Sequence, residues 1–186
     1  MWLEPLQGEL VTLRPVAPGD VEAMWEMLSD PEGRRQTGDL RERSREDVER
    51  WCAEVAGRTD RVDLAITHGS DEYLGEIVLE DIDREHRRAR MRLALRPGQR
   101  GRGFGGEAIE LVLAYGFAPL PAGLGLHRVA LEVLSVNPRA RMLYESLGFL
   151  VEGRQRESHR DGEFWCDSLL MGILEDDYRA THVATG

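Results

Sequence analysis

The chain has 186 residues, of which 41% are hydrophobic and 31% charged, and its net charge is −10. A chain of this length can bury a sufficient core without disulfides or metal. We therefore expect one domain over 1–186, with its core at about 10–174. All 24 basic residues are arginine. The absence of lysine excludes a Walker-type phosphate loop and Schiff-base chemistry.

Charge and patterning also limit the partners and the location of the protein. The N-terminal sequence lacks the basic and apolar regions of a signal peptide, and no apolar run is long enough for a membrane span. We therefore expect a cytoplasmic protein with no membrane partner. The acidic balance argues against DNA binding and suits a cationic small substrate. The two cysteines and five histidines lack ligand spacing, which predicts buried thiols at Cys52 and Cys166 and no metal site.

The first half of the chain is predicted to form a strand, two helices and a three-strand antiparallel meander. The first helix is expected to begin at Asp20 as N-cap and to be ended by Pro31 and Gly33, followed by a loop at 34–43. Ser44 and Asp47 form a capping box that opens the second helix. The four strands are predicted at 10–16, 61–68, 73–83 and 88–95.

The second half is predicted to add helix, strand, helix and a final hairpin. A helix is expected over 107–117 and a strand over 127–133. The next helix begins with Asn137 as N-cap and stops at Gly148. A hairpin that turns at Asp161–Gly162 ends the domain.

The stretch RPGQRGRGFGG at 96–106 places five glycines and three arginines between a strand and a helix. A helix N-terminus with bare backbone and positive charge suits a phosphate group. Gly101, Gly103 and Gly106 match the dinucleotide pattern G-x-G-x-x-G. That pattern normally follows the first strand of a parallel βαβ unit, whereas an antiparallel meander precedes it here. A solvated glycine-rich turn is the remaining alternative.

Two motifs resemble one family. Arg100-x-x-Gly103-x-Gly105 resembles the acetyl-CoA signature Q/R-x-x-G-x-G/A of the GNAT N-acetyltransferase superfamily. One strand downstream, the segment from Asn137 through Tyr144 to Phe149 resembles N-x-x-A-x-x-L/I-Y-x-x-x-G-F of the same family. The segments 29–35, 44–51 and 149–174 look like the RimJ/RimL-like branch, and HRRARMRLAL is similar to spermidine acetyltransferases.

The resemblance implies an α/β (α+β) fold in which a mostly antiparallel mixed sheet is flanked by helices and splayed at the acetyl-CoA site. It implies acetyl transfer from acetyl-CoA to a polyamine-like or other small primary amine, or to a peptide N-terminus, by direct attack in a ternary complex. No metal is involved, and a homodimer is left open. The implied acetyl-CoA contacts are Leu93, Ala94, Leu95, Arg100, Gly101, Arg102, Gly103, Phe104, Gly105, Gly106, Asn137 and Tyr144.

Specific roles follow from the same resemblance. The backbone N–H groups of Ala94 and Leu95 would bind the thioester oxygen, where charge develops. Asn137 would contact the pantetheine arm. Tyr144, whose helical stripe predicts a buried ring, would lie beside the sulfur and protonate the leaving thiolate. A plain helix cap and a core aromatic are the structural alternatives for these two residues.

The general base is not fixed by the motifs. Glu76, Glu80, Asp81 and Asp83 are candidates on or after the strand expected to line the acceptor cleft, with a water chain or solvated surface carboxylates as alternatives. Strand alternation places Glu76 and Glu80 on one face and, where the strand extends that far, Asp81 and Asp83 on the other. The acidic cluster suits a cationic amine. Arg90, which stands where many relatives have an acidic residue, would repel such an acceptor or pair with an acidic one.

Two other functions compete with an active acetyltransferase. The chain could be a catalytically weak acetyl-CoA sensor or interaction module, although Asn137 and Tyr144 favour the enzyme. The stretch 83–92 could form a basic docking patch for RNA, but its interleaved acids are typical of a solvated, salt-bridged face.

Overall fold

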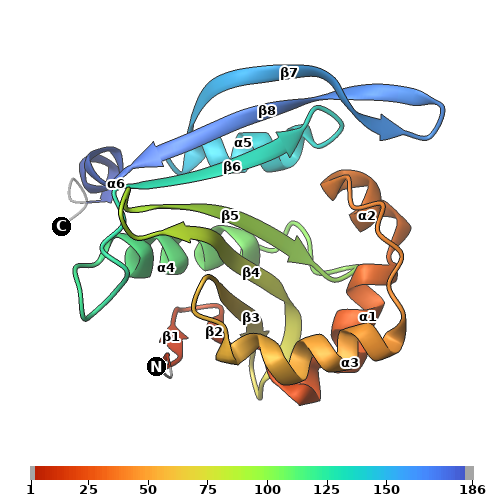
Figure 1. The fold of residues 1–186 in the computed structure, drawn as a ribbon, viewed down its shortest axis with the longest axis horizontal. Coiled ribbons are helices and arrows are strands. Elements are labelled where there is room, and N and C mark those ends of the chain that lie inside the picture. The colour runs from red at the N-terminus through yellow and green to blue at the C-terminus, as the bar shows by residue number, and fades with distance from the viewer. Residues whose placement is uncertain (1–2, 183–186) are drawn as a thin grey trace.

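The computed structural model describes residues 3–182, and its strands form one sheet in the order β1-β2-β3-β4-β5-β6-β8-β7 (Figure 1). The strands are β1 (Leu6–Gln7), β2 (Thr12–Pro15), β3 (Val62–His68), β4 (Glu72–Asp83), β5 (Arg88–Leu95), β6 (Arg128–Leu134), β7 (Leu150–Asp161) and β8 (Phe164–Leu174). The helices are α1 (Val21–Ser29), α2 (Pro31–Thr37), α3 (Arg45–Glu54), α4 (Phe104–Phe117), α5 (Pro138–Ser146) and α6 (Glu175–His182). Only β5 and β6 pair in parallel, which confirms the predicted mixed, mostly antiparallel sheet.

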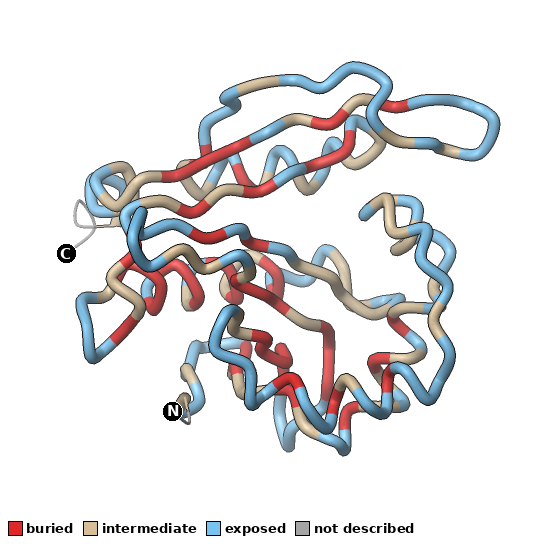
Figure 2. Tube along the Cα trace, viewed as in Figure 1, coloured by how far each residue is buried: buried red, intermediate tan, exposed pale blue. Residues whose placement is uncertain are grey.

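The sheet carries a hydrophobic core on each face, because side chains alternate along every strand. Leu64 and Ile66 of β3 pack in the larger core with Ile109 of α4. Ala65, between them in sequence, faces the other way and joins the smaller core with Met24 of α1. Figure 2 shows the buried segments concentrated along the central strands. The two cores hold α4 on one face and α1 and α3 on the other.

The sheet splits between β5 and β6. These strands pair only at residues 88–90 of β5, after which β5 stays with β4 and β6 with β8. Figure 1 shows them diverging toward the side where α2 lies. The N–H of Arg96 donates to the Leu74 carbonyl (2.8 Å) beside β4. Antiparallel alternation from that point turns the backbone of Leu93 and Leu95 toward the opening and that of Ala94 toward β4.

The predicted helix from Asp20 to Gly33 is two helices, and the predicted loop at 34–43 is helical as far as Thr37. α1 ends at Ser29, and Asp30 then caps α2 by accepting a hydrogen bond from the Gly33 N–H (2.8 Å). Pro31 starts this second helix rather than ending the first, because proline fits the first helical position. Gly38 ends it with a φ of 68°.

Other element boundaries shift by smaller amounts. α4 begins at Phe104, three residues before the expected start at 107, so the last glycines belong to its first turn. The Asp20 carboxylate does not cap α1, and instead accepts from the Ala17 N–H (2.8 Å) and pairs with Arg14 (2.8 Å). The capping box at Ser44 is confirmed. Neither β1 nor α6 was predicted. Within residues 3–182, no helix is both long and apolar enough to cross a membrane.

Candidate active site

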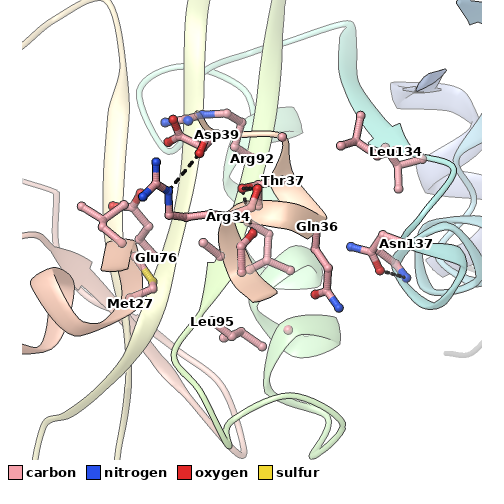
Figure 3. A pocket seen from close by; sticks show the side chains of 18 of the residues that line it. Met27, Arg34, Gln36, Thr37, Asp39, Glu76, Arg92, Leu95, Leu134 and Asn137 are labelled. Atoms are coloured by element: carbon pink, nitrogen blue, oxygen red, sulfur yellow. Dashed lines mark hydrogen bonds between the residues drawn. The ribbon is translucent and has the colours of Figure 1, made fainter. Parts of the chain in front are cut away.

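A cavity of about 1360 Å³ lies between the diverging strands and the segment from α1 to α3. It is lined by residues of both sequence motifs and by acidic residues of β4. Figure 3 shows Glu76 and Arg92 on one side of this space and Asn137 on the other. The predicted acetyl-CoA residues in its wall are Leu93, Ala94, Leu95, Arg100, Gly101, Gly103, Gly105, Gly106, Asn137 and Tyr144.

The glycine loop forms a cradle at the N-terminus of α4. Gly103 occupies the N-cap position with a φ of 87°, a conformation that glycine adopts without strain. The N–H groups of the first turn have no intrahelical partner and carry the positive end of the helix dipole. A Cβ added at Gly105 would lie 3.2 Å from Leu93 Cδ2, a tight contact at the wall of the cavity. This bare, donor-rich backbone fits the pyrophosphate of acetyl-CoA.

Two predicted cofactor residues of the loop point elsewhere. Phe104 is buried in the core, where its ring lies 5.3 Å from that of His68. Arg102 covers the outer side of the Phe104 ring (4.8 Å) and donates to Gln99 (2.8 Å). Neither side chain lines the cavity. The reason is the helix start at Phe104, which turns its side chain into the core and leaves only its backbone N–H at the cradle.

The arginines at the cavity mouth have different partners. Arg100 donates to Asp30 (2.8 Å) and to the Leu95 carbonyl (3.3 Å), so it fastens the loop to the start of α2. Arg139 of α5 lies against Gly101 and lines the cavity, with no ion pair to another residue between 3 and 182. Arg139 was missed by the sequence analysis, although its position two residues after Asn137 places it in the first turn of α5, beside the loop.

Asn137 and Tyr144 are placed by α5. The Asn137 side-chain oxygen accepts from the Ala140 N–H (3.2 Å) and caps the helix. Its amide nitrogen lines the cavity without a partner among the described residues. Tyr144 is buried against Phe149, with ring centroids 5.8 Å apart. Burial raises the pKa of Tyr144 to about 12, so its hydroxyl keeps its proton and remains a donor at neutral pH.

Glu76 is the predicted base candidate that reaches the cavity without an ion pair. Its Oε2 atom is buried and has no hydrogen-bond partner among the described residues. Burial, together with the nearby charge of Asp63, raises the pKa of Glu76 to about 7, against the opposing effect of Arg92 and Arg61. A carboxylate with this pKa can accept a proton near neutral pH.

The other candidates for the general base pair with arginine or lie outside the cavity. Glu80 lines the cavity but pairs with Arg92 (3.1 Å), Arg61 (3.6 Å) and Arg90 (3.7 Å). Asp81 is exposed outside the cavity wall, with a φ of 52°. A register shift in β4 between Glu80 and Asp83 causes this turn of the chain.

The backbone N–H groups that face the opening differ in part from the expected pair, Ala94 and Leu95. Strand alternation directs the N–H groups of Leu93 and Leu95 into the opening, while that of Ala94 lies in the ladder with Glu76 of β4. Leu93 and Leu95 are therefore the residues whose backbone can bind an oxygen between the strands.

Comparison with known proteins agrees with this geometry. Residues 11–150 match the Acetyltransferase (GNAT) domain family. The chain belongs to this family. It is 27% identical over 175 residues to the uncharacterized N-acetyltransferase YokL of Bacillus subtilis (strain 168), over 94% of this chain and 96% of that protein. It is 32% identical over 116 residues to the spermidine N(1)-acetyltransferase of Escherichia coli (strain K12), over 62% and 60% of the two chains.

The solved GNAT structures include a close match in fold. The spermidine N-acetyltransferase of Vibrio cholerae, in complex with CoA and spermine, superimposes with a TM-score of 0.84 at 24% identity, over 92% of this chain and 99% of that one. The GNAT chain described here is an N-acetyltransferase that uses acetyl-CoA.

Proposed function

We propose that this GNAT enzyme transfers the acetyl group directly to a primary amine of a small molecule, with Glu76 as general base and Tyr144 as general acid. One observation carries the proposal: the unpartnered, buried oxygen of Glu76 lies in the same cavity as the glycine cradle and Tyr144. A protein that only binds acetyl-CoA does not need a buried, unpaired carboxylate that can accept a proton.

The acceptor must lose a proton before it attacks. An alkylamine of the lysine type has a reference pKa of about 10.4 and is almost entirely protonated at neutral pH. The pKa of Glu76, about 7, allows this carboxylate to accept that proton as the new C–N bond forms. The proton, which would otherwise remain on the nitrogen, moves to Oε2.

Two further groups serve the carbonyl and the leaving sulfur. The N–H groups of Leu93 and Leu95 are fixed donors for the oxygen on which negative charge develops. As the C–S bond breaks, the sulfur takes its electron pair. The Tyr144 hydroxyl can donate a proton to it, which is modest assistance because a thiol has a reference pKa of about 8.5.

The positions of the thiols favour direct attack over an acetyl-enzyme intermediate. Cys52 and Cys166 are both buried, and neither lines the cavity. Burial raises the pKa of the Cys52 thiol to about 11, so it does not ionise at neutral pH.

The test is release of CoA in the presence of a panel of primary amines. The panel includes a peptide N-terminus, because the resemblance of residues 149–174 to RimJ/RimL-like enzymes implies this class of acceptor. We expect Glu76→Gln to lower kcat/KM by about 10²–10⁴-fold. Asp81→Asn, the matched control outside the cavity, should keep it. Equal losses in both variants would reject Glu76 as the base, and a stable acetyl adduct on the protein would reject direct attack.

A further inference from the structure

The acceptor end of the cavity gathers positive charge, although the whole chain has a net charge of −10. The register of β4 and β5 places Arg90 opposite Glu80 and Arg92 opposite Val78. Because paired residues project to the same side of a sheet, both arginines share the face that carries Glu76. The charged residues that line this part of the cavity are Arg34, Arg41, Arg43, Arg61, Arg90 and Arg92, with Asp39, Asp47, Glu76 and Glu80.

Arg90 and Arg92 have unused hydrogen-bonding capacity. Arg90 lies 3.7 Å from Glu80 and 3.5 Å from Asp81, and Arg92 lies 3.1 Å from Glu80. Neither guanidinium donates a hydrogen bond to any residue that the structure describes. Each carries five N–H donors in a planar arrangement that matches the two oxygens of a carboxylate. Both can therefore bind a further anionic group.

Two carboxylates of this part of the cavity are each engaged by more than one arginine. Glu80 is shared by three guanidinium groups, of which Arg61, at 3.6 Å, pairs more closely with the buried Asp63 (2.6 Å). Asp39 is likewise shared by Arg41 (3.0 Å) and Arg43 (2.7 Å). A second cation, such as the distal ammonium of a polyamine, would therefore meet carboxylates that arginines already engage.

The pair of Arg90 and Arg92 is distinct from the phosphate cradle. Arg92 precedes the backbone segment 93–95 that faces the thioester, and the glycine loop follows it, so the two positive regions lie at opposite ends of that segment. Arg92 and Glu76 occupy diagonal positions on β5 and β4. Diagonal neighbours lie about 7–8 Å apart, a span that a small molecule with two functional groups can bridge.

We infer that the acceptor is a primary amine that also bears a carboxylate, with Arg90 and Arg92 binding the carboxylate while Glu76 faces the amine. The inference rests on the function proposed above and narrows its substrate. It departs from the expectation of a purely cationic amine. Of the acids behind that expectation, Glu80 pairs with arginine and Asp81 lies outside the cavity, which leaves Glu76 to face the amine.

The experiment compares matched acceptors. The probes are free amino acids and short acidic peptides, the carboxamides of the same compounds, and spermidine. CoA release gives kcat/KM, and calorimetry gives the affinity of each amine for the CoA-bound protein. We expect each carboxylate to be preferred over its carboxamide by at least about tenfold, and spermidine to be the poorest acceptor.

Variants assign the preference to the two arginines. Arg92→Gln and Arg90→Gln should each lower kcat/KM and affinity for the carboxylate at least about tenfold more than for the carboxamide. The control Arg88→Gln changes an exposed arginine of the same strand and face that pairs with Asp83 outside the cavity, and should keep the wild-type preference.

The outcomes distinguish failure of the acceptor inference from failure of the proposed function. Preference for spermidine, or equal effects of Arg92→Gln on both members of each pair, would overturn the inference and leave the acetyltransferase mechanism standing. No turnover of any amine by a protein that binds acetyl-CoA would overturn the proposed function and this inference with it. Circular dichroism on each variant verifies that a lost preference does not reflect unfolding.

Discussion

Replacing Glu76 by glutamine should make the enzyme less active and more stable at the same time. The carboxylate lies half-buried in the cavity with its Oε2 unpartnered, and its pKa is about 7 instead of the ordinary 4.5. The folded protein therefore holds this proton more tightly than the unfolded chain does. Glutamine keeps the shape of the side chain and cannot ionise.

The size and sign of the stability change follow from the two pKa values. Because the folded state binds the proton more tightly, the free energy of unfolding falls as pH rises from about 4.5 to about 7, and stays lower above that range. The loss corresponds to about 3 kcal/mol once the group is fully ionised. Glu76→Gln removes this loss, so the variant should be more stable than the wild type by up to about 3 kcal/mol at pH 8, and by less than about 1 kcal/mol at pH 5.

Urea denaturation of both proteins at pH 5 and pH 8 measures the stability difference. Asp81→Asn, at an exposed carboxylate, should change stability by no more than about 0.5 kcal/mol at either pH. In the wild type, kcat/KM should rise about tenfold per pH unit below pH 7 and level off above it. A Glu76→Gln variant that is less stable than wild type at pH 8, or an acidic limb centred near pH 4.5, would refute the buried-base argument.

Three other substitutions separate structural roles from catalytic ones. Tyr144→Phe removes only the hydroxyl, so kcat should fall at least about tenfold while acetyl-CoA affinity is kept; an unchanged kcat with chemistry rate-limiting would return the residue to a packing role. Gly105→Ala should weaken CoA binding measured by calorimetry, by filling the cradle, without lowering the melting temperature, because alanine favours a helix over glycine; unchanged affinity would argue against the phosphate contact. Asn137→Asp keeps a capping oxygen but loses the amide donor, so KM for acetyl-CoA should rise with little change in stability, whereas an unchanged KM with unchanged stability would indicate a cap and nothing more.

The cofactor side of the site could be predicted because its signals are local. The glycines leave the backbone exposed at the start of α4, and Asn137 caps α5. Both effects depend only on residues that are close together in the sequence. The buried face that contains Tyr144 is set by helical spacing on α5. The start of α4 was placed three residues late, at 107 instead of Phe104, so the burial of the Phe104 side chain was not foreseen.

The acceptor side could not be predicted, because it depends on which distant residues meet. Glu76 and Glu80 occupy equivalent positions on one strand face, and the sequence does not show that three arginines converge on Glu80 alone. The irregular register that turns Asp81 outward has no sequence signature comparable to a glycine turn. Likewise, Pro31 can end one helix or begin another, and the position of Asp30 as a cap decided between them.

The central claim is that this chain moves an acetyl group from acetyl-CoA to an amine in one step. Mass spectrometry of reactions with isotopically labelled acetyl-CoA and the amine panel tests it most directly. We predict one labelled acetyl group on the amine for each CoA released, with the protein mass unchanged and the product greatly reduced by Glu76→Gln. Labelled free acetate without any acetylated amine, or label retained on the protein, would contradict the account.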